Sequence, residues 1–247
     1  MLHFGKTHLG NRKPENQDYI AWNEGMKRFV VADGMSGLAH GALASRIVCD
    51  AIAGANAPRS LEAALSAAQN ALLARAQADG RMGATGIVAD FGATGCRLAW
   101  LGDCRGYLWR DHALTRLTAD HSVEAMLHGG SDRTRASSGQ DLDTVTRYFG
   151  SDDAVASVRD IELREGDWIL LCSDGLWRVV TDEQIGNLLD DADSLHDAVF
   201  ALVAASLSAG APDNLSVLLV DPGPSREARH GTTPPSVSTG SRGDAPM

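Results

Sequence analysis

The sequence predicts an α+β fold in which most strands pair in antiparallel fashion, and three observations support that prediction. Short apolar segments alternate with turns of hairpin length between residues 83 and 117. Two amphipathic helical segments follow the first strands, which suggests a helical layer over a sheet. The chain has 247 residues, of which 44% are hydrophobic, so it can bury one substantial core in one large domain.

The predicted strands are short segments of apolar or alternating character bounded by turn residues. They lie at residues 2–8, 19–32 (two strands), 83–91, 96–101, 106–109, 113–117, 155–163, 168–172 and 215–220. The turns at residues 92–95 and 110–112 have lengths typical of β-hairpins. Such turns favour antiparallel pairing over a doubly wound parallel sheet.

The predicted helices begin at capping residues, and their apolar residues form one stripe. In the segment 40–54 apolar residues recur at every fourth position, so one face is expected to be buried. Ser60 is expected to cap a second helix. The run Thr181–Gln184 matches a capping box, and Ser194 is expected to begin the last helix.

Two segments lack any such periodicity. Residues 121–148 are rich in Ser, Asp, Gly and Arg, and an irregular stretch of this length inside a domain is usually a functional loop or lid. From Pro222 onward the chain has few aliphatic residues, which is typical of disorder. We therefore predict a folded domain at residues 1–221 and a disordered tail at residues 222–247.

Charge and composition exclude several classes of partner. The formal net charge of −10 argues against nucleic acid or an anionic membrane, because both attract clustered Lys and Arg. No apolar run approaches the roughly 18 residues of a membrane span, and the N-terminus lacks a signal-peptide pattern, so we expect a cytoplasmic protein. The four cysteines form no C-x-x-C pair and are expected to be reduced core thiols.

Carboxylates stand at the ends of several predicted strands. Asp33 follows an apolar run and precedes Gly34, and Asp174 repeats this pattern after residues 168–172. Asp213 directly precedes the last strand, and Asp103 closes another. If these strand ends converge, the oxygen ligands would suit Mg²⁺ or Mn²⁺.

The order of the polar motifs resembles that of the metal-dependent Ser/Thr protein phosphatases of type 2C, the PPM family, in their short bacterial form. The resemblance covers residues 1–220 and rests on the ordered set Arg12, Glu15-Asn16-Gln17-Asp18, Asp33-Gly34, Gly102-Asp103-Cys104-Arg105, Asp120-His121-Ser122, Ser173-Asp174-Gly175 and Asp213-Asn214. It implies a four-layer αββα sandwich, in which two antiparallel sheets pack face to face with a helix pair outside each.

The resemblance also implies a metal site. Asp33 resembles the carboxylate that bridges two ions, and Gly34 resembles the residue whose carbonyl binds one of them. Asp174 and Asp213 resemble the other ligands of the second ion. An aspartate at the position of Asp120 often binds a third, weaker ion in bacterial members, with help from Asp174. The implied ions are Mn²⁺ or Mg²⁺.

The implied activity is that of a protein serine/threonine phosphatase. Two ions about 3.5–4 Å apart activate water for in-line attack on a phosphomonoester, with no covalent intermediate. Arg12 resembles the residue that grips the substrate phosphate, and Asp18 resembles a carboxylate that orients metal-bound water. The implied partners are phosphorylated proteins and a Ser/Thr kinase that the enzyme opposes, and the enzyme is expected to be a monomer.

Some residues depart from the family pattern. Leu38 occupies the position of the usual His, and His40 lies two residues further on. Cys104 replaces the usual Ser and is expected to pack in a strand, whereas Asp103 is expected to be structural. Within residues 121–148 the usual H-P-x-x-N spacing is missing, so the residues that select substrates there are not predicted.

Three other functions fit parts of the sequence. An inactive relative that binds phosphoproteins is disfavoured because all the core carboxylates are present. A nucleotide-hydrolysing α/β enzyme would need a G-x-x-x-x-G-K-[ST] loop, which does not occur. A scaffolding domain with aspartates in ordinary turns leaves unexplained why Asp33, Asp174 and Asp213 all stand at the ends of apolar strands.

Overall fold

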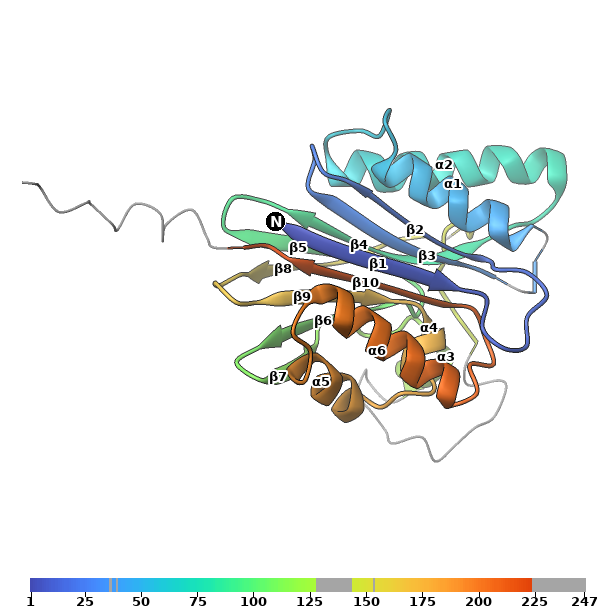
Figure 1. The fold of residues 1–247 in the computed structure, drawn as a ribbon. Helices are drawn as coiled ribbons and strands as arrows, with labels where there is room; N and C mark the ends of the chain where they lie inside the picture. Colours follow the sequence, from blue (N-terminus) through green and yellow to red (C-terminus); the bar gives the residue numbers. More distant parts are fainter. Residues whose placement is uncertain (36, 39, 128–143, 153, 224–247) are drawn as a thin grey trace, which may run out of the picture.

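The structure, a computed structural model, describes residues 1–35, 37–38, 40–127, 144–152 and 154–223 (Figure 1). In this part of the chain the strands form two five-stranded sheets, and all pairings between neighbouring strands are antiparallel. The first sheet has the order β1 (Leu2–His8), β10 (Leu215–Asp221), β9 (Trp168–Cys172), β6 (Arg105–Arg110) and β7 (Ala113–Arg116). The second sheet has the order β2 (Asp18–Asn23), β3 (Arg28–Gly34), β4 (Ala84–Phe91), β5 (Gly95–Leu101) and β8 (Ser157–Glu162).

Helices cover the outer face of each sheet, which gives four layers (Figure 1). Two long helices lie over the second sheet: α1 (Gly41–Ala53) and α2 (Leu61–Asp79). Two others lie over the first sheet: α5 (Asp182–Asp190) and α6 (Leu195–Ser208). Two short helices occupy the connections: α3 (Val123–Leu127) and α4 (Asp174–Trp177). The α+β sandwich that the resemblance implied is confirmed.

Strand β3 shows why the apolar run in the sequence is continuous rather than alternating. Phe29 and Val31 point into the core between the two sheets, whereas Val30 and Ala32 point into the core beneath α1 and α2. Because successive side chains of a strand face opposite ways, a strand with helices on one side and a sheet on the other needs apolar residues at every position.

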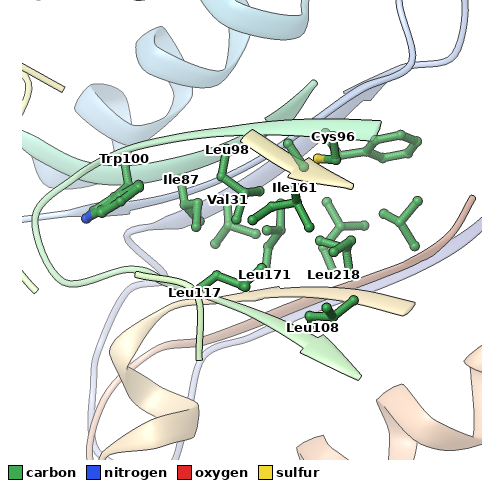
Figure 2. Close-up of a cluster of buried hydrophobic side chains, with 14 of the residues drawn as sticks. Val31, Ile87, Cys96, Leu98, Trp100, Leu108, Leu117, Ile161, Leu171 and Leu218 are labelled. Carbon is green, nitrogen blue, oxygen red and sulfur yellow. The ribbon is translucent and has the colours of Figure 1, made fainter. Parts of the chain in front are cut away.

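The core between the sheets is built from aliphatic side chains on facing strands (Figure 2). Val31, Ile87 and Leu98 come from the second sheet, and they face Leu171 and Leu218 of the first. These side chains are fully buried. The packing fixes how the two sheets are placed, and therefore where their strand ends meet.

Most predicted elements are confirmed, including their caps. Ser60, Thr181 and Ser194 each accept a hydrogen bond from a backbone N–H in the first turn of the helix they precede. Helix α4 was not predicted, because four residues are too few to show helical periodicity. The predicted loop at residues 121–148 contains α3, and its central part lies outside the described residues, as does the predicted tail from residue 224 onward.

The cysteine prediction also agrees with the structure, since all four cysteines are buried and free. Cys104 Sγ lies 3.3 Å from Thr85 Oγ1, in keeping with a packing role. In the described part of the chain, each helix is too short or too polar to cross a membrane.

Candidate active site

The first pair of acidic residues meets at the end of a β-hairpin. Asp18 opens β2, and the antiparallel register places it opposite Asp33 near the end of β3. The buried Asp18 accepts a hydrogen bond on Oδ2 from Ser173 Oγ at 2.7 Å. Ser173 follows β9, so this bond joins the ends of the two sheets. The same hydroxyl accepts a hydrogen bond from the Ser216 N–H at 2.9 Å.

A second pair, Asp174 and Asp213, comes together through a close backbone approach. Asp174 begins α4, and the next residue, Gly175, lies so near β10 that a Cβ there would be 1.9 Å from the carbonyl oxygen of Asn214. A glycine is therefore required at this position. Burial raises the pKa of Asp174, and the charge of Asp213 raises it further, as expected for neighbouring carboxylates.

Asn214 holds the polar loop at residues 9–17 against this region. Its Nδ2 donates hydrogen bonds to the carbonyl oxygens of Leu9 at 2.8 Å and Glu15 at 3.0 Å. Its Oδ1 accepts a hydrogen bond from the Gln17 N–H at 2.8 Å. One amide side chain thus satisfies three backbone groups, and it fixes the loop next to Asp213, which precedes β10.

The loop brings the cationic side chain of Lys13 to the site. Gly10 has a positive φ of 77°, and a Cβ there would be 2.0 Å from the carbonyl oxygen of Asp213, so the loop backbone packs directly on this residue. Lys13 Nζ lies 2.7 Å from Asp213 Oδ1. Arg12 is exposed to solvent.

The aspartates at these strand ends share one electrostatic environment. Burial raises the pKa of Asp33 well above its usual range, and four neighbouring carboxylates raise it further: Asp18, Asp174, Asp103 and Asp213. Burial also raises the pKa of Asp18 to about 7 and that of Asp103 to about 7. Several acidic side chains are therefore crowded together at one edge of the sandwich.

Two oxygens in this cluster are suited to a cation. Asp18 Oδ1 and Asp174 Oδ1 are buried and have no hydrogen-bond partner among the described residues. A buried carboxylate oxygen without a partner is costly, and a hard divalent cation would satisfy it. The donor set consists of oxygens from carboxylates and the backbone, so these residues fit Mg²⁺ or Mn²⁺.

Three of the carboxylates are engaged by the chain's own cations. Arg178 Nε donates to Asp174 Oδ2 at 2.6 Å, and Arg178 Nη2 donates to Asp103 Oδ2 at 3.2 Å. Lys13 engages Asp213. Among the described residues, no group of three or more His, Cys, Asp and Glu side chains is already arranged around a common metal position.

Comparison with known proteins identifies the family. The sequence model of the family described as protein phosphatase 2C matches residues 4–219.

The chain belongs to the protein phosphatase 2C family.

This membership agrees with the family that the order of motifs indicated. The chain is 32% identical over 231 residues to the serine/threonine protein phosphatase PstP of Mycobacterium tuberculosis, an alignment that covers 87% of this chain and 44% of that protein. The chain thus spans about half the length of the first curated relatives it matches.

Solved structures of the family share the fold. The crystal structure of the Mycobacterium tuberculosis phosphatase PstP/Ppp superposes with a TM-score of 0.80 at 29% identity, covering 90% of this chain and 98% of that one. The catalytic domain of PstP in complex with two manganese ions gives a TM-score of 0.75 at 26% identity, covering 89% and 97%.

The structure brings most of the predicted site residues of this phosphatase-family chain together. Asp18, Asp33, Asp174 and Asp213 lie in the acidic cluster. Gly34 is buried directly after Asp33, and its N–H donates to the Gln17 carbonyl at 3.0 Å. The predicted structural role of Asp103 agrees with its bond to Arg178, although its charge also belongs to the cluster.

Asp120 is held differently from the other predicted ligands. Arg105 binds it in bidentate fashion, with Nε donating to Oδ1 at 3.1 Å and Nη2 to Oδ2 at 2.8 Å. Arg116 pairs with the same carboxylate. The guanidinium of Arg105 also stacks on Trp177, 3.5 Å from the ring centroid. A third ion at Asp120 would compete with these arginines and stays a prediction.

The two histidines near the site differ in environment. His40 precedes α1 with a positive φ of 57° and is exposed, so a catalytic role for it stays a hypothesis. His121 is buried: its Nδ1 accepts a hydrogen bond from the Gly102 N–H, and its Nε2 lies 2.9 Å from Ser157 Oγ. Burial lowers the pKa of His121 to about 4, which favours a neutral structural residue.

Sequence reasoning assigned no role to four residues that shape the site. Ser173 and Asn214 belong to motifs that were quoted, but their hydrogen bonds span distant parts of the chain. Arg178 lies four residues after Asp174, a spacing that could have indicated a helical ion pair. For Lys13, the only sequence feature that could have indicated a role at the site is its position next to Arg12.

Proposed function

We propose that this chain is a protein serine/threonine phosphatase that uses Mn²⁺ or Mg²⁺. The observation that supports this proposal most directly is the convergence of strand-end aspartates from both sheets, with two buried oxygens that lack partners, in a chain of the protein phosphatase 2C family. The two manganese ions in the structure of the PstP catalytic domain support the choice of metal. We assign the activity to residues 1–221.

In this proposal Asp33, the carbonyl of Gly34, Asp174 and Asp213 hold two ions in the core site. Such ions lower the pKa of a bound water and offset the charge of the phosphate. Carboxylates with raised pKa values exchange their protons for these ions, so the acidic cluster becomes ionised on binding. Asp120 is assigned to a third, weaker ion.

Two residues act on the substrate side of the proposed reaction. Arg12 stands exposed on the loop at residues 9–17, where its planar guanidinium can bind two phosphate oxygens at once. Asp18 is fixed by Ser173 through Oδ2, and its buried Oδ1 has no partner among the described residues, so it could accept a hydrogen bond from the attacking water. The phosphoryl group passes directly to water, so the chain needs no nucleophilic side chain.

The names of the curated relatives support the proposed class of substrate. Phosphorylated proteins are the proposed substrates, because the curated relatives are named serine/threonine phosphatases. We also propose that the enzyme acts as a monomer in the cytoplasm and opposes a Ser/Thr kinase. The short bacterial family members that the chain resembles support this part of the proposal.

The deciding experiment measures phosphate release from phosphothreonine and phosphotyrosine peptides, with Mn²⁺ and after treatment with EDTA. The proposal expects release from the phosphothreonine peptide only, and none after chelation. Full activity in EDTA would contradict the metal mechanism. Tight binding of the phosphothreonine peptide without any release would favour the alternative of an inactive phosphoprotein-binding relative.

A further inference from the structure

Lys13 is a cation placed inside the acidic cluster. Its Nζ lies 2.7 Å from Asp213 Oδ1, and the two side chains are only 26% and 35% exposed. The positive charge of Lys13 also counteracts the raised pKa of Asp174, after the larger effect of Arg178. Lys13 therefore pairs with Asp213, and its charge favours the ionised form of Asp174, the other aspartate assigned to the second ion.

The backbone determines this placement. The loop at residues 9–17 is tied to the neighbouring loop by the Asn11 N–H, which donates to the Ala211 carbonyl at 2.9 Å. Asn214 binds the loop on the other side of Lys13, at Glu15. These hydrogen bonds on both sides of Lys13 hold its backbone near Asp213. The backbone therefore favours the ion pair between the two side chains.

Arg178 and Lys13 differ in whether a metal ion could bind their aspartate partners while the ion pair stays in place. Arg178 binds Oδ2 of Asp174 and leaves Oδ1 of the same carboxylate without a partner. An ion can therefore bind Asp174 while Arg178 stays in place. On Asp213, Oδ1 accepts from both the Lys13 ammonium and the Asn214 N–H. An ion on either oxygen of Asp213 would face the ammonium across a few ångströms, where like charges repel strongly.

We propose that Lys13 is an internal counter-cation, which stabilises the metal-free site and must leave Asp213 when the second ion binds. The inference rests on the proposed function, because it takes Asp213 as a metal ligand. It makes Lys13 a positioning residue that sets metal affinity. Its charge should weaken metal binding and should stabilise the metal-free protein.

The first test compares Mn²⁺ binding by calorimetry in the wild type and Lys13→Met. The variant should bind Mn²⁺ about fivefold more tightly, the change expected when an ion pair of about 1 kcal/mol no longer competes. Its melting temperature should fall in EDTA but not in saturating Mn²⁺. A purely structural lysine would instead lower both melting temperatures and would leave the affinity unchanged.

Two variants serve as controls. Lys27→Met removes the same charge from an exposed turn at the far end of the hairpin that carries Asp18 and Asp33, and it should leave Mn²⁺ affinity unchanged. Lys13→Arg keeps a cation for Asp213 and should bind Mn²⁺ nearly as the wild type does. Equal affinity in the wild type and Lys13→Met would overturn the inference.

A second readout needs no mutation, because the chain contains only three lysines: Lys6, Lys13 and Lys27. In protein labelled with ¹³C and ¹⁵N at lysine, Mg²⁺ should shift the side-chain signal of Lys13 and leave the other two in place. An unmoved Lys13 signal, with Mg²⁺ binding shown by calorimetry, would overturn the inference and leave the proposed function intact. If the wild type bound neither Mg²⁺ nor Mn²⁺, the inference and the proposed function would fail together.

Discussion

Ser173 Oγ donates a hydrogen bond to Asp18 Oδ2 at 2.7 Å, and this contact joins the ends of the two sheets at the site. Replacing Ser173 by Ala should leave Asp18 Oδ2 and the Ser216 N–H without a buried partner. We expect a loss of about 1–3 kcal/mol in the free energy of unfolding, measured by urea denaturation. We also expect a lower kcat with Mn²⁺, because Asp18 is no longer held in place.

Ser45→Ala provides the matched control. Ser45 is also fully buried, but its hydroxyl donates to the Ala42 carbonyl within α1 rather than to a residue of the acidic cluster. This variant should keep the wild-type kcat. Equal kcat values in Ser173→Ala and Ser45→Ala would show that the Ser173 bond does not position Asp18 for catalysis.

The raised pKa of Asp18 predicts a pH dependence of stability. Its pKa is about 7 in the folded protein, whereas the ordinary value of 3.8 applies to the unfolded chain. Between these two values the folded state therefore binds more protons than the unfolded state. Its contribution to stability is therefore complete below pH 4 and is lost as the pH rises through 7. In EDTA, Asp18→Asn should gain melting temperature relative to the wild type between pH 5 and pH 8, by about 2–4 °C for each kcal/mol.

Mn²⁺ provides the control for this measurement. A bound divalent ion favours the ionised carboxylates, so it should stabilise the wild type more at pH 8 than at pH 5. A difference in melting temperature between the wild type and Asp18→Asn that stays constant over this range would contradict the pH prediction.

Much of the fold could be predicted from the sequence because its signals are local. The apolar run that ends at Asp33-Gly34 and the capping box at Thr181 both predict elements that the structure contains. The partners of the site residues depend on register and packing between distant segments. Lys13 and Asp213 are 200 positions apart in the sequence. Their ion pair forms because Asn214 holds the loop at residues 9–17, which carries Lys13.

The contacts of Asp120 show the same limit. The family resemblance implied a weak metal site at Asp120, which lies after a strand and before an irregular loop. Its two arginine partners come from β6 and β7, and both ion pairs are about nine-tenths buried. Asp120→Asn should therefore cost about 2–4 kcal/mol in the free energy of unfolding, measured by urea denaturation.

A stability control and a metal titration separate the two roles of Asp120. Asp160→Asn removes a carboxylate from the exposed ion pair with Arg97 and should change stability little. If Asp120 also holds a third ion, Asp120→Asn should lower kcat at saturating Mn²⁺ while two ions remain bound by calorimetry. Wild-type stability in Asp120→Asn would show that the arginine pairs contribute little.

Arg12 is predicted to bind the substrate phosphate before the reaction. Arg12→Ala should raise KM for a phosphothreonine peptide by about tenfold and change kcat much less, since the lost contact exists in the ground state as well. The melting temperature should not change, because the side chain is exposed. Arg46→Ala, which removes an exposed arginine from α1, should keep the wild-type KM. An equally unchanged KM in Arg12→Ala would remove Arg12 from the substrate site.

The central claim is that Asp33 lies between two catalytic ions. Its most direct test is kcat for release of phosphate from a phosphothreonine peptide by Asp33→Asn at saturating Mn²⁺, in protein shown to be folded by circular dichroism. The account predicts a kcat below a tenth of the wild-type value, a loss of more than about 1.4 kcal/mol in transition-state stabilisation. A variant that kept more than a tenth of the wild-type kcat would contradict the assignment of the site.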